Sequence, residues 1–445
     1  MAKKHTIFEC QFCGWQSAKW LGKCSSCGSW DALVELKEHQ IEAKKHHTAS
    51  PSKATPITQV HFEDIVHFSS YEEEFDIVLG GGIVPGGLYL IGGSPGVGKS
   101  TLLLKIVGNL AAKAHKKILY VSGEESAGQI KMRASRLNAM SDELFLLNEI
   151  DLNLIINALN EQPYSLCVID SIQTIYSPEL SSAPGSISQV REVTFALMRL
   201  AKERNISIFI IGHITKDGAI AGPRILEHMV DCVLYFEGDP SRELRMLRGF
   251  KNRFGSTSEI GIFEMKENGL RSAKNASKLF FTQKSAQAGS AIAVILEGSR
   301  ALVIEIQALV SESTYPKRSC NGFDSNRLNM LLALLERKLE LPLGRYDVFV
   351  NVAGGIRISE PSADLAVIAS IISSFRNRPL NAKTAFVGEV SLVGDIREVS
   401  NIDARLKELE SYGFEKVILA KKPSSASAHI KCFEANEVSK ILDWM

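Results

Sequence analysis

The sequence lacks any long apolar run, and none of its segments approaches the roughly 18 residues needed to span a bilayer. The opening residues, MAKKHTIFEC, also lack the apolar stretch of a signal peptide. Net charge is nearly absent, at +1 from 51 Lys and Arg against 50 Asp and Glu, so any nucleic-acid-binding surface must be local. From these absences we expect a cytoplasmic protein without a membrane segment.

Cysteine is scarce, with eight in the chain, yet four of them form one compact motif. Cys10, Cys13, Cys24 and Cys27 are spaced as C-x2-C-x10-C-x2-C. In a reducing cytoplasm this spacing favours four thiolates around a tetrahedral Zn2+ over two disulfides. The tryptophans and lysines beside the motif suit either stacking on nucleic-acid bases or packing in the module's own small core, and the sequence leaves both open.

A second motif predicts a nucleotide site. Residues 92–101 read GGSPGVGKST and contain the phosphate-loop pattern G-x4-G-K-S. An apolar run at 88–93 predicts a buried strand before it, and an amphipathic stretch at 101–116 predicts a helix after it. In such a loop backbone N–H groups surround the phosphates, the lysine reaches the β and γ oxygens, and the serine holds Mg2+. The predicted nucleotide-binding residues are Gly93, Ser94, Pro95, Gly96, Val97, Gly98, Lys99, Ser100 and Thr101.

The chain of 445 residues is too long for one core, and its composition changes along its length. We expect a zinc module at 1–36, followed by a polar linker rich in Lys and His at 37–58. Residues 59–271 alternate strand-like and helical stretches, which is typical of a mostly parallel α/β sheet. Residues 272–445 form a further α/β region.

Polar residues end three of the predicted strands of this sheet. They are Glu124, Asp170 and His213. Because ligands bind at the carboxyl ends of parallel strands, we expect all three near Lys99. Asp170 would then help to hold Mg2+, Glu124 would orient the attacking water, and His213 would sense the γ-phosphate. The alternative for each acid is a helix N-cap.

Longer segments carry a family resemblance. VLGGGIVPGGLYLIGGSPGVGKSTLLLKI, YVSGEES, VIDSIQT, GHITKDG and KNRFG, preceded by the cysteine module, resemble the bacterial RadA (Sms) family of DNA-repair ATPases over essentially the whole chain. The resemblance implies a RecA-like ATPase core that uses ATP and Mg2+, assembled as a homo-hexameric ring. It also implies DNA-stimulated hydrolysis that drives unwinding or branch migration, with single-stranded DNA, branched DNA and the RecA recombinase as partners.

The resemblance also gives a role to KNRFG at 251–255. It implies that this segment lies at the subunit boundary, where Lys251 and Arg253 would reach a neighbour's γ-phosphate or DNA. A cation supplied by a neighbour neutralises charge on the transferred phosphoryl group and makes hydrolysis depend on assembly. From spacing alone, a solvated basic turn is an equal alternative.

The C-terminal region resembles the proteolytic domain of Lon, which uses a Ser–Lys dyad. Ser362 lies in the altered setting Glu360-Pro361-Ser362-Ala363-Asp364, and Asp403 occupies the position of the lysine. Without that base a serine hydroxyl is a poor nucleophile, so we expect a Lon-like scaffold that helps to close the ring rather than a peptidase. An ATP-dependent protease and a KaiC-like timing ATPase or autokinase remain the alternative functions.

Overall fold

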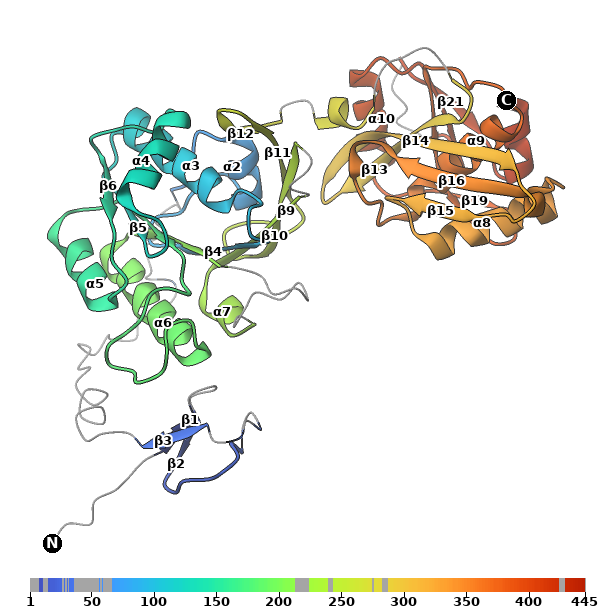
Figure 1. The fold of residues 1–445 in the computed structure, drawn as a ribbon. Coiled ribbons are helices and arrows are strands. Elements are labelled where there is room, and N and C mark those ends of the chain that lie inside the picture. The colour runs from blue at the N-terminus through green and yellow to red at the C-terminus, as the bar shows by residue number, and fades with distance from the viewer. Residues whose placement is uncertain are drawn as a thin grey trace, which may run out of the picture. The chain divides into compact units, whose positions relative to one another are not determined.

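The computed structural model describes residues 8–10, 15–25, 28, 30, 32–35, 56, 58, 66–212, 224–238, 243–273, 276–281, 287–423 and 429–444. The chain divides into two compact units, Met1–Ser272 and Ala273–Met445 (Figure 1). In the first 35 residues, β1 (Phe8–Cys10) is the central strand of a small antiparallel sheet with β2 (Gln16–Ser17) and β3 (Leu33–Glu35).

A nine-stranded sheet forms the core of the first unit. Its strands from β9 to β6 are parallel, whereas β10, β11 and β12 extend one edge in antiparallel fashion. The expected mostly parallel α/β sheet is therefore confirmed. In spatial order the strands are β12 (Gly269–Ser272), β11 (Ile260–Lys266), β10 (Leu244–Asn252), β9 (Cys232–Glu237), β4 (Leu88–Gly93), β8 (Ser207–Ile211), β7 (Leu166–Asp170), β5 (Ile118–Ser122) and β6 (Leu144–Leu147).

Helices cover both faces of this sheet. Alternate residues of β4 enter different cores: Tyr89 and Ile91 pack on one face, Leu88 and Leu90 on the other, as the two-residue period of a strand requires. Because both faces are covered, the central strands are apolar throughout. The first face carries α2 (Glu73–Leu79), α3 (Lys99–Ala114) and α4 (Ala127–Arg136), and the second carries α5 (Leu152–Glu161), α6 (Ile187–Arg204) and α7 (Arg224–Met229).

The strand predicted at 88–93 is confirmed as β4, and the helix after it begins at Lys99, two residues before the predicted start. The helix α6 begins at Ile187, where the Ser186 side chain caps it by accepting a hydrogen bond from the Gln189 N–H. Among the helices that the structure describes, none has the length and apolar character needed to cross a bilayer.

The second unit is an α/β domain built on a seven-stranded mixed sheet. α8 (Ser325–Lys338), α9 (Asp364–Phe375) and α10 (Ile402–Ser411) accompany this sheet, and β18 (Glu389–Val390) pairs with β19 (Ile396–Arg397) beside it. α9 is buried along nearly its whole length and contacts β13, β14 and β17. The order of the seven strands is β15 (Arg318–Asn321), β16 (Tyr346–Val352), β14 (Arg300–Glu312), β13 (Ser290–Glu297), β17 (Thr384–Val387), β20 (Lys416–Leu419) and β21 (Lys431–Glu434).

Candidate functional site

The segment between β4 and α3 forms a tight, glycine-dependent loop. Gly96 and Gly98 have φ angles of 77° and 113°, in the left-handed region that favours glycine. A Cβ on Gly98 would lie 3.0 Å from Met265 Cε, whereas the space beside Gly96 is open to 4 Å. α3 starts directly after Gly98 and carries no acidic residue in its first turn, so its N-terminal amides favour an anion. The loop therefore fits a phosphate group.

Lys99 places a buried cation inside this loop. Its side chain is 4% exposed, and its Nζ donates to the carbonyl oxygens of Gly93 at 2.6 Å and Ser94 at 3.1 Å. Burial lowers the pKa of Lys99, while the charges of Asp170 and Glu124 act in the opposite direction. The amine is thus held beside two acidic groups and can exchange loop carbonyls for phosphate oxygens.

Asp170 ends β7 and is held by two hydroxyl groups. Burial raises the pKa of this carboxyl, and hydrogen bonds from Tyr120 and Ser100 partly offset that effect. The Tyr120 hydroxyl donates to Asp170 Oδ2 at 2.6 Å, and both side chains are buried. The Ser100 hydroxyl and the Asp170 carboxylate form an all-oxygen donor set, which suits Mg2+. Nothing local in the sequence marks Tyr120, because it is 50 positions from Asp170.

Two adjacent acids follow β5, and the structure separates their surroundings. Glu124 is exposed and accepts a hydrogen bond from the Ser171 hydroxyl, directly after Asp170. Glu125 instead pairs with Arg133, and its carbonyl oxygen accepts from Asn148. Glu124 is therefore the acid that lies beside the end of β7, as expected, where its exposed carboxylate can meet a water molecule.

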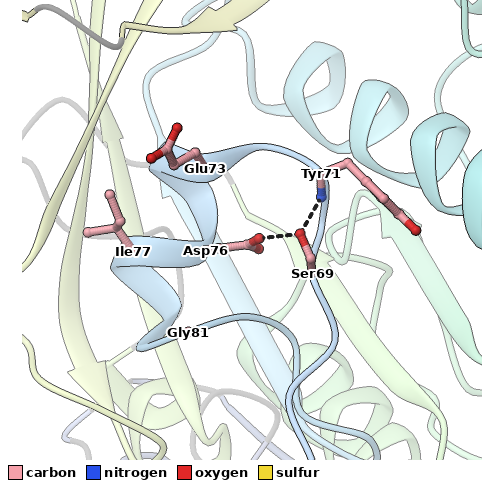
Figure 2. A pocket seen from close by; sticks show the side chains of 6 residues that line it. All are labelled: Ser69, Tyr71, Glu73, Asp76, Ile77 and Gly81. Atoms are coloured by element: carbon pink, nitrogen blue, oxygen red, sulfur yellow. Dashed lines mark hydrogen bonds between the residues drawn. The ribbon is translucent and has the colours of Figure 1, made fainter.

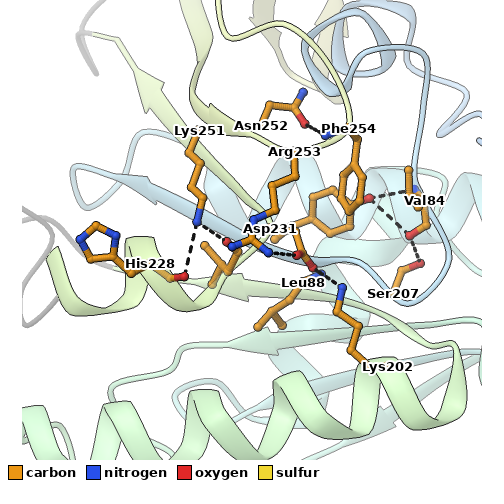
Figure 3. Close-up of polar contacts among 12 residues, drawn as sticks. Val84, Leu88, Lys202, Ser207, His228, Asp231, Lys251, Asn252, Arg253 and Phe254 are labelled. Carbon is orange, nitrogen blue, oxygen red and sulfur yellow. Dashed lines mark hydrogen bonds and ion pairs between the residues drawn. The ribbon is translucent and has the colours of Figure 1, made fainter. Parts of the chain in front are cut away.

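Lys251 lies at a β-bulge in β10 and is tied to the end of a short helix. The register against β9 shifts between Gly249 and Lys251. The Lys251 Nζ donates to the backbone oxygens of Glu227 at 2.7 Å and Val230 at 2.8 Å, at the C-terminus of α7. Figure 3 shows the same ammonium directed toward the backbone oxygen of His228. Burial and the neighbouring Arg253 lower the pKa of Lys251. A cation at this end also matches the helix dipole.

Arg253 lies at the amino-terminal end of strand β4, whereas the phosphate loop follows the carboxyl-terminal end of the same strand. Its Nη1 is 3.5 Å from Asp231 Oδ1, and its side chain is 61% exposed (Figure 3). Asp231 precedes β9 and accepts from the N–H of Leu88, the first residue of β4, at 3.0 Å. The phosphate loop leaves the other end of β4 at Gly93, about 16 Å away at strand rise. Within one chain, the structure does not bring Arg253 to Lys99.

A surface pocket of about 550 Å³ lies beside α2 (Figure 2). It contains none of the predicted site residues. Its Asp76 carboxylate is already engaged, since Oδ2 accepts the Ser69 hydroxyl at 2.6 Å and Oδ1 accepts the Ser70 N–H at 2.9 Å. The pocket is lined by Ser69, Tyr71, Glu73, Asp76, Ile77 and Gly81.

In the second unit, Ser362 is buried beside an arginine instead of a lysine. The Ser362 hydroxyl donates to Glu360 Oε1 at 2.5 Å and accepts from Arg405 Nη1 at 3.0 Å. Arg405 is fully buried and also bonds both carboxylate oxygens of Glu360 at 2.8 Å. Asp403 is exposed at the start of α10. Because a guanidinium cannot accept a proton, it offers Ser362 no base. Arg405 was not among the residues predicted from the sequence, although it lies only two positions after Asp403.

The structure describes half of the predicted zinc set. Cys10 and Cys24 are both buried, which is compatible with metal ligation. Cys13 and Cys27 lie outside the described residues, as does His213. Among the described residues, no group of three or more metal-binding side chains occurs.

Three protein-family models match separate parts of the chain. The model described as "AAA domain" matches residues 56–219, and "Rubredoxin metal binding domain" matches residues 8–35. The model described as "Subunit ChlI of Mg-chelatase" matches residues 326–423. These matches cover the phosphate loop, the cysteine motif and most of the second unit in turn.

Curated relatives match the chain over its whole length. The "DNA repair protein RadA" of Helicobacter pylori J99 is 65% identical over 100% of both chains, and that of Campylobacter jejuni is 59% identical over 100% of both. The protein of the same description from Bacillus subtilis is 47% identical over 94% of this chain and 93% of its own. A solved KaiC-like protein from Pyrococcus horikoshii aligns with 47% of this chain and 99% of its own, at 20% identity and a TM-score of 0.40.

Proposed function

The chain belongs to the RadA family of DNA repair proteins, with a RecA-like ATPase core, a zinc ribbon and a ChlI-like C-terminal domain, and from this we propose that it is a DNA-dependent ATPase motor. It acts in homologous recombination and repair, where ATP hydrolysis drives branch migration or unwinding of recombination intermediates. Its substrates are single-stranded and branched DNA. The working form is a homo-hexameric ring that cooperates with the RecA recombinase.

The observation that carries this proposal is the separation of Lys99 from Arg253. Lys99, Ser100 and Asp170 gather at the carboxyl edge of the sheet, whereas Arg253 is anchored to Asp231 at the opposite edge. One subunit thus supplies phosphate-binding groups at one edge and an exposed cation at the other. Head-to-tail assembly would join the two, and repeated around an axis this contact closes a ring.

We assign each residue of the composite site one task. Lys99 and the loop amides bind the β- and γ-phosphates, and Ser100 and Asp170 would hold Mg2+ through oxygen ligands. Bound Mg2+ neutralises part of the phosphate charge. Glu124, held by Ser171, orients the attacking water and takes its proton.

The neighbouring subunit completes this site. Arg253 of one subunit neutralises the charge that develops on the phosphoryl group bound by the next. Lys251 holds the segment against α7 of its own chain and adds positive charge beside Arg253. Hydrolysis then requires assembly, because a single chain holds the two halves of the site at opposite ends of its central strands.

The second unit serves this motor as a Lon-like scaffold without peptidase activity. Arg405 occupies the hydrogen-bonding position beside Ser362 and offers no lone pair to receive its proton. The zinc ribbon would hold Zn2+ through Cys10, Cys13, Cys24 and Cys27 and contribute to the handling of DNA.

A direct test compares ATP turnover with and without single-stranded DNA, beside casein digestion and labelling of the protein by γ-32P-ATP. We expect DNA to stimulate turnover, with no casein cleavage and no stable phosphoprotein. Casein cleavage would establish the protease alternative, and a phosphorylated chain without DNA stimulation would establish the autokinase alternative. Either result would overturn the proposal.

A further inference from the structure

Asp231 is a buried carboxylate at which three elements of the ATPase domain meet (Figure 3). It is 4% exposed and lies immediately before β9. Its Oδ2 accepts the Leu88 N–H at 3.0 Å and the Lys202 ammonium at 2.9 Å, and its Oδ1 faces Arg253 Nη1 at 3.5 Å. Asp231 and Arg253 are also joined through the backbone, because the Arg253 N–H donates to the Asp231 carbonyl oxygen at 3.1 Å.

The contact between Asp231 and Arg253 contributes little to folding. The Arg253 side chain is 61% exposed and its Nη1 lies 3.5 Å from Asp231 Oδ1, so solvent screens most of the attraction. A free arginine side chain, however, samples many rotamers, and fixing it costs entropy when it binds a partner. One anchored nitrogen restricts the side chain in advance and leaves the other guanidinium N–H groups available to phosphate oxygens.

Asp231 also fastens this arginine to the rigid part of the sheet. Asp231 and Leu88 exchange two hydrogen bonds, since the Asp231 N–H donates to the Leu88 carbonyl at 2.9 Å and the carboxylate accepts the Leu88 N–H. Leu88 begins β4, the strand that ends in the phosphate loop. Two groups of opposite charge pair with the carboxylate, Lys202 from α6 and Arg253 from the KNRFG segment. Lys251 is also close: burial lowers its pKa, and the charge of Asp231 acts in the opposite direction.

We propose that Asp231 is a positioning residue that presents Arg253 to the nucleotide of the neighbouring subunit. The inference rests on the proposed function, because it requires Arg253 to act across a subunit boundary. Asp231 touches no phosphate itself and acts only through Arg253. Without Asp231, a subunit should present its Arg253 poorly to the nucleotide of its neighbour. Its own phosphate loop should still bind ATP.

The test uses full-length Asp231→Asn. An asparagine can still accept from Leu88 through its oxygen, but it then turns an N–H2 group toward Arg253. We expect DNA-stimulated kcat to fall about tenfold, less than for Arg253→Ala, with unchanged affinity for a fluorescent ATP analogue. Asp231→Ser, which keeps a short acceptor near Leu88, provides a second variant if Asp231→Asn folds poorly.

Mixing experiments separate positioning from a structural defect. Asp231→Asn subunits mixed with Lys99→Ala subunits should gain several-fold activity over the unmixed variants, because the second supplies an intact Arg253. Mixed with Arg253→Ala subunits, they should gain none. Asp364→Asn is the control, because it makes the same change at a buried Asp that pairs with Arg327 in the second unit. It should recover no more activity with one of the two partners than with the other.

Two outcomes distinguish the inference from its premise. If Lys99→Ala and Arg253→Ala subunits exchange but recover no activity together, Arg253 does not act in trans and the proposed function fails. If that pair does recover activity, then wild-type turnover by Asp231→Asn, or equal recovery with both partners, overturns the role of Asp231 alone.

Discussion

The Tyr120 hydroxyl donates a hydrogen bond of 2.6 Å to Oδ2 of Asp170, and both residues are buried between neighbouring strands β5 and β7. Tyr120 cannot reorient freely, because its ring belongs to the apolar core beneath α3 and α4. The hydroxyl therefore fixes Oδ2, and the carboxylate also accepts a hydrogen bond from Ser100 at the end of the phosphate loop. Such outer-shell partners set the orientation of a metal ligand.

Tyr120→Phe should weaken Mg2+ binding without unfolding the domain. The substitution keeps the aromatic ring and removes only the hydrogen bond to Asp170. We expect the Mg2+ concentration for half-maximal ATP turnover to rise about tenfold. Tyr164→Phe, at a tyrosine that packs against Phe145 in the core on the other face of the sheet, is the matched control and should leave the Mg2+ requirement unchanged. Equal behaviour of the two variants would remove Tyr120 from the site.

Removal of Lys251 or Arg253 should separate nucleotide binding from hydrolysis. Binding depends on Lys99 and Ser100, so the affinity of either alanine variant for an ATP analogue should match wild type. Turnover of Arg253→Ala should fall roughly 1,000-fold, because the cation that stabilises the transferred phosphoryl group is lost. Turnover of Lys251→Ala should also fall by orders of magnitude, because Lys251 holds this segment against α7 and adds positive charge beside Arg253. Lys266→Ala, at an exposed lysine on β11, serves as the control. Normal turnover by Arg253→Ala would contradict its role.

Cys24→Ser should release zinc and impair DNA-linked activity more than basal ATP hydrolysis. A serine hydroxyl is a poor substitute for a thiolate ligand, and the cysteine motif is remote in sequence from the phosphate loop. Elemental analysis measures the metal, and turnover with and without single-stranded DNA measures the coupling. Cys432→Ser, at a partly buried cysteine on β21, is the matched control. Unchanged zinc content in Cys24→Ser would disprove four-thiolate coordination.

Arg405 should stabilise the second unit in a pH-dependent way. Burial alone would raise the pKa of Glu360, but hydrogen bonds from Arg405, Ser362 and the Leu296 N–H hold that pKa below its ordinary value of 4.5. A pKa lowered by folding adds stability above about pH 4.5, which is lost as the pH falls through the folded value. Arg405→Met leaves Glu360 unpaired and should cost about 3–5 kcal/mol at pH 7.

Urea unfolding at pH 7, 5 and 4 checks this expectation. Trp444 packs against Phe433 at the end of the second unit, so its fluorescence reports on this unit. The difference in free energy of unfolding between wild type and Arg405→Met should be smaller at pH 4 than at pH 7. Arg405→Lys, which keeps the charge, should lose less stability than Arg405→Met. A deficit that stays constant with pH would show that Arg405 contributes packing instead of charge.

The strand and the helix on either side of the phosphate loop could be predicted because their signal is local. An apolar run, a glycine-rich loop and a helix start follow one another between Leu88 and Lys99, and β4 and α3 form there. Glu124 and Asp170 also follow their strands at one edge, since parallel strands share a direction. Their roles remain predictions.

The supporting contacts could not be predicted in the same way. Arg405 meets Glu360 across 45 positions and Asp231 meets Leu88 across 143, so only the folded sheets bring these pairs together. Their residue types are also ambiguous in sequence, because an Arg on a helix or an Asp before a strand is ordinarily solvated. The antiparallel extension β10–β12 had no distinctive pattern among the parallel strands.

Branch migration on a synthetic three-stranded junction tests directly whether ATP hydrolysis at the Lys99 site moves branched DNA, as we propose. We expect strand exchange by the wild-type chain with ATP and Mg2+. We expect none with a non-hydrolysable analogue or with Lys99→Ala, whose folded structure circular dichroism would verify. Strand exchange by Lys99→Ala at the wild-type rate, or DNA-stimulated hydrolysis that moves no junction, would contradict this proposal.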